Sequence, residues 1–140
     1  MPAPERVHKM ADLWLSRART DLAAARVVFR RDPDVEPWIA VFHAQQAAEK
    51  AIKAILVARN INPPYVHDLS ELAGKLPPGA HAGASMEDVD RLDDLSAGVR
   101  YLGLSIGLME QREPTWVEAD ESLAIATRIV EAATAQIRGR

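Results

Sequence analysis

The sequence predicts an all-α protein, an antiparallel up-and-down bundle of four longer helices plus one short helix. Three long stretches contain no internal proline, residues 5–32, 38–62 and 115–140, and no glycine occurs before Gly74. Apolar residues in these stretches recur at spacings of three and four, which is the period of an amphipathic helix. No stretch shows the apolar–polar alternation of a β-strand. Because the expected connections are short to moderate, we predict antiparallel neighbours and a bundle.

The first and last helices are each predicted from one apolar stripe and from residues that mark one helix boundary. The first stripe runs from Val7 to Phe29, and the acidic, proline-containing segment 32–34 ends it. The last helix starts at Thr115, directly after a proline, and its stripe continues to Ile137. Both stripes are wide enough to face a shared core.

The stretch from Pro37 to about Asn60 predicts a helix that packs closely on several sides. Proline is favoured in the first turn of a helix, where its missing N–H is not needed. Alanines interleave with the apolar face at positions 40, 47, 51, 54 and 58. Since small side chains let neighbouring helices approach closely, we expect this helix to be the most buried.

Two further helices are predicted between these long ones. The segment Asp68-Leu69-Ser70-Glu71 has the spacing of a capping box and starts a short helix to about Lys75. Ser85 resembles a second cap and begins a helix that runs toward Tyr101. Residues 102–113 stay ambiguous, because apolar residues there are interrupted by two glycines, which weaken a helix.

Length and composition exclude several classes of protein. At 140 residues, the chain is expected to be a single helical domain over 1–140. It has no cysteine, which excludes disulfides, thiolate metal sites and a cysteine nucleophile. A net charge of −3 argues against a globally basic nucleic-acid binder. The four histidines lack metal-ligand spacing, so we expect no metal and no cofactor. Without a leader or a long apolar run, we expect a cytoplasmic protein that does not contact membranes.

One face of the second predicted helix carries polar residues that could bind a ligand. At spacings of three, four and three, the residues on this face are His43, Gln46, Lys50 and Lys53. Gln45 and Glu49 form a second polar column beside them. The ordinary interpretation is a solvated face. The functional interpretation is a charged strip that faces a dimer partner or a phosphate-bearing ligand.

The run from Gln45 to Ala54, followed by His67-Asp68-Leu69, resembles the HEPN domain (higher eukaryotes and prokaryotes nucleotide-binding). An upstream helix containing Trp14 and a downstream Arg100-Tyr101 extend the resemblance over about residues 8–137. The resemblance implies an up-and-down helical bundle that is usually a homodimer. It also implies a frequent pairing with a minimal nucleotidyltransferase, in two-gene systems that behave as toxin and antitoxin.

Many HEPN proteins are metal-independent ribonucleases, and this chain departs from their signature. That signature is an arginine followed, after four to six residues, by a histidine that moves a proton while the arginine holds the phosphate. No histidine follows Arg100, and the nearest approach, Arg59 to His67, has seven residues between. We therefore assign no catalytic residue and expect the usual ribonuclease apparatus to be absent.

Arg100 and His67 each allow two interpretations. Arg100 is either a fork for phosphate or carboxylate, or an ion-pair partner of Asp93, Asp94 or a glutamate on another helix. His67 is either a structural histidine hydrogen-bonded to a loop carbonyl or, like His43, a substitute acid–base group. Together with the polar strip of the second helix, these residues form the predicted ligand-binding or RNA-phosphate-binding set.

Three functions follow from these observations. The first is a HEPN-like homodimeric binding module, paired with a minimal nucleotidyltransferase and with nucleotide or RNA as further candidate ligands. In that case we expect the polar strip and Arg100 to face the crevice between the two copies. The second is a metal-independent RNA-cleaving toxin with a non-standard catalytic set. The third is a purely structural dimerisation protein.

Overall fold

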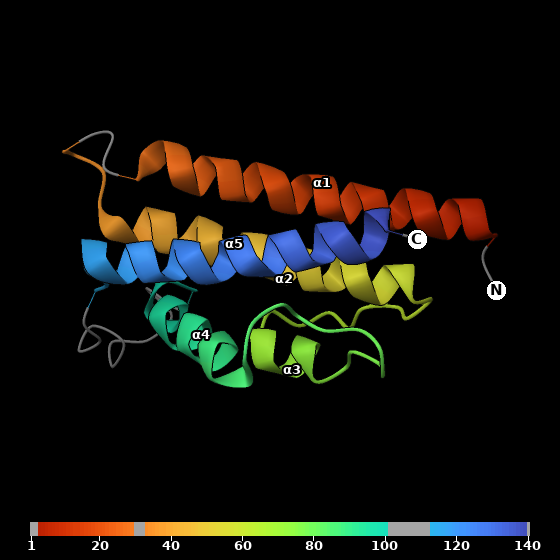
Figure 1. The fold of residues 1–140 in the computed structure, drawn as a ribbon. Helices are drawn as coiled ribbons and strands as arrows, with labels where there is room; N and C mark the ends of the chain where they lie inside the picture. Colours follow the sequence, from red (N-terminus) through yellow and green to blue (C-terminus); the bar gives the residue numbers. More distant parts are fainter. Residues whose placement is uncertain (1–2, 30–32, 101–112, 140) are drawn as a thin grey trace.

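The computed structural model describes residues 3–29, 33–100 and 113–139, apart from the side chains of residues 98–100. These residues form five helices and no strand, so the predicted all-α bundle is confirmed. The helices are α1 (Pro4–Val28), α2 (Pro37–Ala58), α3 (Leu69–Ala73), α4 (Met86–Arg100) and α5 (Trp116–Arg138). In Figure 1, α1 and α4 run toward one end of the bundle, and α2 and α5 run toward the other.

Helix α2 lies at the centre of the bundle and packs against all four other helices. Its buried positions cover most of the circumference of the helix and include six fully buried alanines: Ala40, Ala44, Ala47, Ala48, Ala51 and Ala54. Small side chains allow α1 and α5 to pack closely against it. Among the described residues α2 has the largest buried set, so the prediction that it is the most buried helix is confirmed.

The ends of the helices follow the signals in the sequence. Thr115 and Glu118 form a reciprocal capping box at the start of α5. At the start of α3, the Asp68 carboxylate accepts hydrogen bonds from the backbone N–H groups of Ser70 and Glu71. The Ser85 hydroxyl accepts from the Asp88 N–H at the start of α4. Side-chain caps therefore fix where three of the helices begin.

Helix α1 ends at Val28, earlier than the predicted end near residue 32. Phe29 has extended backbone angles, and its ring packs edge-to-face on Trp116 with the ring centroids 5.4 Å apart. This edge-to-face pair holds Phe29 against the start of α5. The ambiguous segment 102–113 lies outside the described residues except for its last position.

No helix in the described part of the chain is both long enough and apolar enough to span a lipid bilayer.

Candidate functional site

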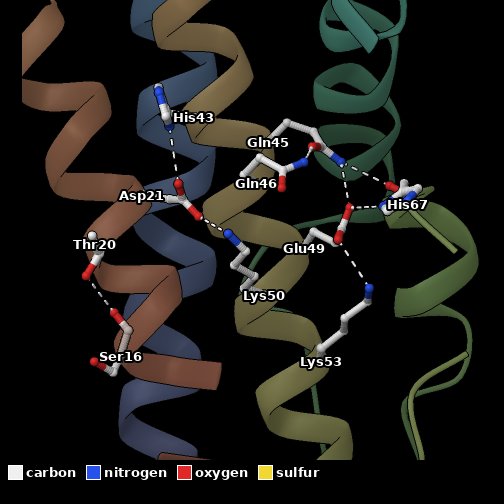
Figure 2. A network of polar contacts seen from close by, with 10 residues as sticks. All are labelled: Ser16, Thr20, Asp21, His43, Gln45, Gln46, Glu49, Lys50, Lys53 and His67. Atoms are coloured by element: carbon white, nitrogen blue, oxygen red, sulfur yellow. Dashed lines mark hydrogen bonds and ion pairs between the residues drawn. The ribbon is translucent and has the colours of Figure 1, made fainter. Parts of the chain in front are cut away.

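The polar side chains of α2 point to two sides of the helix and meet different partners (Figure 2). His43 and Lys50 face α1, whereas Lys53 lies beside Glu49 and the loop before α3. The spacing places Lys53 on one helical face with His43 and Lys50, but in the structure Lys53 has different partners from these two residues. Helical spacing predicts that these side chains lie within one arc of the helix. In the structure, α1 on one side and the loop before α3 on the other separate them into two clusters.

The first group, which we call the Asp21 cluster, consists of Asp21, His43 and Lys50. Asp21 on α1 accepts from both α2 residues: its Oδ1 lies 3.2 Å from His43 Nδ1 and its Oδ2 lies 2.5 Å from Lys50 Nζ. The side chains are 16% exposed for Asp21, 25% for Lys50 and 30% for His43. The cluster ties the middle of α1 to α2.

The second group, the Glu49 cluster, consists of Gln45, Glu49, Lys53 and His67. Glu49 is only 5% exposed, and its carboxylate lies 3.2 Å from Lys53 Nζ and 3.1 Å from His67 Nδ1. Gln45 donates from Nε2 to the backbone carbonyl of His67 at 2.9 Å and contacts Glu49 Oε1 at 3.5 Å. Gln46, a further predicted site residue, donates to Gln45 Oε1 at 2.8 Å.

Burial explains why the Glu49 cluster needs this many donors. A carboxylate removed from water is unfavourable unless cations and hydrogen-bond donors replace its hydration. Lys53 is itself only 7% exposed, so it neutralises Glu49 inside the protein rather than facing solvent. The solvated-face interpretation is therefore wrong for both residues. The sequence signal that could have found this pair is the i,i+4 spacing of Glu49 and Lys53.

His67 is fixed at two points, although its side chain is 55% exposed. Its backbone carbonyl accepts from Gln45, and its ring contacts the Glu49 carboxylate. Because a carboxylate accepts hydrogen bonds, the contact favours the tautomer with the proton on Nδ1, and Nε2 is then the basic nitrogen. A half-exposed imidazole that a buried carboxylate orients is suited to acid–base chemistry.

The side chain of Arg100 lies outside the described residues, so both interpretations of this residue stay predictions. Arg100 is the last residue of α4. Asp93, one of its predicted partners, accepts hydrogen bonds from the backbone N–H groups of Leu69 and Ser70 and so anchors α3 to α4. Burial, together with a hydrogen bond to Asp68, raises the pKa of Asp93 above its ordinary value, and these backbone donors oppose the rise.

Within the described part of the chain, no three His, Asp or Glu side chains come close enough to hold a metal ion.

The chain is similar to a curated protein over part of its sequence and to a solved structure over most of its fold. The curated relative, "Putative toxin MJ1304" of Methanocaldococcus jannaschii, is 40% identical over 55 residues, which is 38% of this chain. The match spans only 33% of that protein's length. The solved structure of TT1696 from Thermus thermophilus superposes with a TM-score of 0.69 at 27% identity. The superposition covers 90% of this chain and 97% of TT1696.

The family comparison covers most of the bundle. The family model for the HEPN domain matches residues 11–136, a range that contains both α2 clusters and every predicted site residue. The order of elements is the one the resemblance implied: a long first helix, the alanine-rich α2 with its polar residues, the His67-Asp68-Leu69 segment and a last amphipathic helix. This chain belongs to the HEPN domain family.

Proposed function

We propose that the chain is the toxin-type member of a two-gene system and acts as a homodimeric binding module that docks a minimal nucleotidyltransferase. Membership of the HEPN family and the partial likeness to a protein named as a toxin support the toxin-type assignment. The observation that carries the choice of binding over RNA cleavage is the pairing of both α2 lysines with carboxylates of the same chain.

That pairing argues against α2 as a binding surface for RNA phosphates. Affinity for a nucleic-acid backbone comes largely from cations that replace the counterions of the phosphates. Lys50 is neutralised by Asp21, and Lys53 is neutralised by Glu49 and is nearly inaccessible to solvent. With a net charge of −3 on the whole chain, a protein partner fits this surface better than an RNA.

The end of the bundle where α1 finishes and α5 begins offers a surface for a protein partner. The side chains of Val27 and Val117 are 64% and 75% exposed there, beside the packed pair Phe29 and Trp116. Large apolar side chains in water, next to aromatic residues, are typical of protein interfaces. We propose that this end contacts the second copy or the nucleotidyltransferase.

Co-expression with the product of the adjacent gene, followed by size-exclusion chromatography with light scattering, tests this proposal. We expect a dimer of this chain that co-purifies with the partner, and we expect V117E to lose the dimer or the partner. M86E is the matched control, since Met86 is an exposed apolar residue at the start of α4. A wild-type monomer that captures no partner would contradict the proposal and leave the structural-module alternative.

One observation favours a second candidate function, metal-independent RNA cleavage. His67 presents a half-exposed ring that Glu49 orients, so an acid–base group exists despite the missing arginine–histidine spacing. If this function is correct, the purified protein degrades RNA in the presence of a metal chelator and H67A abolishes the activity. H81A is the control, because His81 is exposed in a different loop. Intact RNA with wild-type protein would rule this candidate out.

A further inference from the structure

A cavity of about 510 Å³ lies between the first turns of α1 and the end of α2. Its lining combines apolar side chains with three polar ones: Arg6, Val7, Met10, Trp14, Val57, Asn60, Ile61, Asn62 and Pro63. Small-molecule sites in proteins fall in this range of volume, about 300–1,000 Å³, and are mostly apolar with a few polar groups. The predicted site residues are not part of this lining.

The turn that ends α2 forms one wall of the cavity. Asn60 has a positive φ of 61°, a left-handed conformation that asparagine tolerates better than most residues. The Asn60 N–H donates to Val57 O and the Ile61 N–H donates to Leu56 O, which is the Schellman pattern. The chain therefore reverses sharply and brings residues 60–63 beside the first turns of α1.

The apolar part of the cavity is made by Trp14, Met10 and Val57. Trp14 is half-buried, and Lys53 Nζ lies 5.5 Å from the centroid of its ring, which holds the indole between the core and the cavity. Met10 is 44% exposed, so this apolar surface faces solvent. A flat indole next to a flexible thioether is a good surface for a second flat ring.

The polar part is made by Arg6, Asn60 and Asn62. None of these three side chains forms a hydrogen bond or an ion pair with the rest of the described chain, and Arg6 brings a positive charge to the cavity. Guanidinium and amide N–H groups are donors suited to an anionic oxygen. The cavity thus combines an aromatic surface with a guanidinium and two amides that have no hydrogen-bond or ion-pair partner within the described residues.

From this geometry we infer that the cavity binds a small flat aromatic ring carrying one negative charge, an aryl carboxylate in chemical terms. The ring lies against Trp14 and Met10, and the carboxylate lies near Arg6 with the two asparagine amides as further donors. This site is separate from the proposed partner docking surface. The cavity lies at the first turns of α1, whereas Val27 is at the last turn of α1 and Val117 follows Trp116, which packs on Phe29.

Titration with 1-naphthoate and with its neutral isostere 1-naphthamide tests the inference on the full chain. Backbone amide shifts in two-dimensional NMR locate the ligand, and we expect the largest shifts at residues 6–14 and 57–63 and at the Trp14 indole N–H. We expect naphthoate to bind at least about threefold more tightly than naphthamide, the size of effect that one partly exposed charge pair supplies. Equal affinity, or shifts elsewhere, would overturn the inference.

Three variants sharpen this test. R6Q removes the charge and should reduce the preference for naphthoate to about one, whereas R17Q, an exposed arginine further along α1, should leave it unchanged. V7F fills the cavity from the first turns of α1 and should weaken both ligands. If V7F binds both ligands as the wild type does, or R6Q keeps the full preference, the inference is wrong. Circular dichroism confirms that each variant is folded.

Discussion

The Asp21 cluster and the Glu49 cluster share a carboxylate–lysine–histidine arrangement but have different surroundings. In each, one carboxylate is shared by a lysine and by the Nδ1 of a histidine, and the lysine comes from α2. In the Asp21 cluster the carboxylate is on α1, and the side chains of Lys50 and His43 are 25% and 30% exposed. In the Glu49 cluster the carboxylate and the lysine are almost fully buried and share one helix.

This difference shows how burial changes the role of an ion pair. Water can replace a lost partner in the Asp21 cluster, so that cluster mainly sets the register of α1 against α2. Water cannot reach the Lys53–Glu49 pair as easily, so the loss of either partner leaves a charge uncompensated inside the bundle. The Glu49 cluster also contacts His67 and so ties the loop before α3 to α2.

The largest effect is expected for E49Q. Removing the carboxylate leaves the Lys53 ammonium buried without its partner, and breaking a buried pair in this way costs about 3–5 kcal/mol of the free energy of unfolding. Urea denaturation followed by circular dichroism measures it. The double variant E49Q/K53M removes both charges and should recover part of the loss. A loss below about 1 kcal/mol for E49Q, within the range of an exposed pair, would contradict the comparison.

A smaller effect is expected for D21N. His43 and Lys50 keep access to water, so the loss should be about 1 kcal/mol, as for a partly exposed ion pair. Added salt screens such pairs, so the difference between wild type and D21N should shrink in 1 M NaCl, while that for E49Q should change little. Equal losses for D21N and E49Q would show that burial does not separate the two clusters.

The smallest effect on the free energy of unfolding is expected for Asp93. Its carboxylate accepts hydrogen bonds from backbone N–H groups at the start of α3. Its pKa is raised in the folded protein, mainly by burial, from an ordinary value of 3.8. The folded state therefore favours the protonated form, so this contribution to stability is complete below pH 3.8 and is lost as the pH rises through the raised pKa.

Urea denaturation of the wild type and of D93N at successive pH values measures this contribution. The free energy of unfolding of the wild type minus that of D93N should fall as the pH rises above 3.8. D94N, at an exposed position of the same helix, is the control for changes in net charge. A difference that stays constant, or that rises with pH, would be inconsistent with the effect of burial on Asp93.

The fold could be predicted from the sequence because its signals are local. Caps such as Thr115 and Asp68, the proline that begins α2 and the proline before α5, and the apolar stripes each act within one or two turns of a helix. The predicted end of α1 is less accurate. Phe29, which follows the last helical residue, packs on Trp116, a residue 87 positions later in the chain.

The partners of the α2 side chains could not be predicted in the same way. Helix periodicity places His43, Lys50 and Lys53 within one arc of α2. It does not predict how α1 is aligned along α2, nor where the loop that contains His67 runs. Asp21 lies 29 residues before Lys50, and that contact exists only once the helices have packed. The cavity beside Trp14 was missed for the same reason, since it depends on the reversal of the chain at Asn60.

The central claim is that the lysines of α2 serve the fold and are not available to RNA. Fluorescence anisotropy of a labelled single-stranded RNA at low salt tests it on wild type and K50Q. We predict the same weak binding for both proteins, with the same dependence on salt. If K50Q weakened binding several-fold and lowered the salt slope by about one, Lys50 would be a phosphate contact and the claim would be refuted.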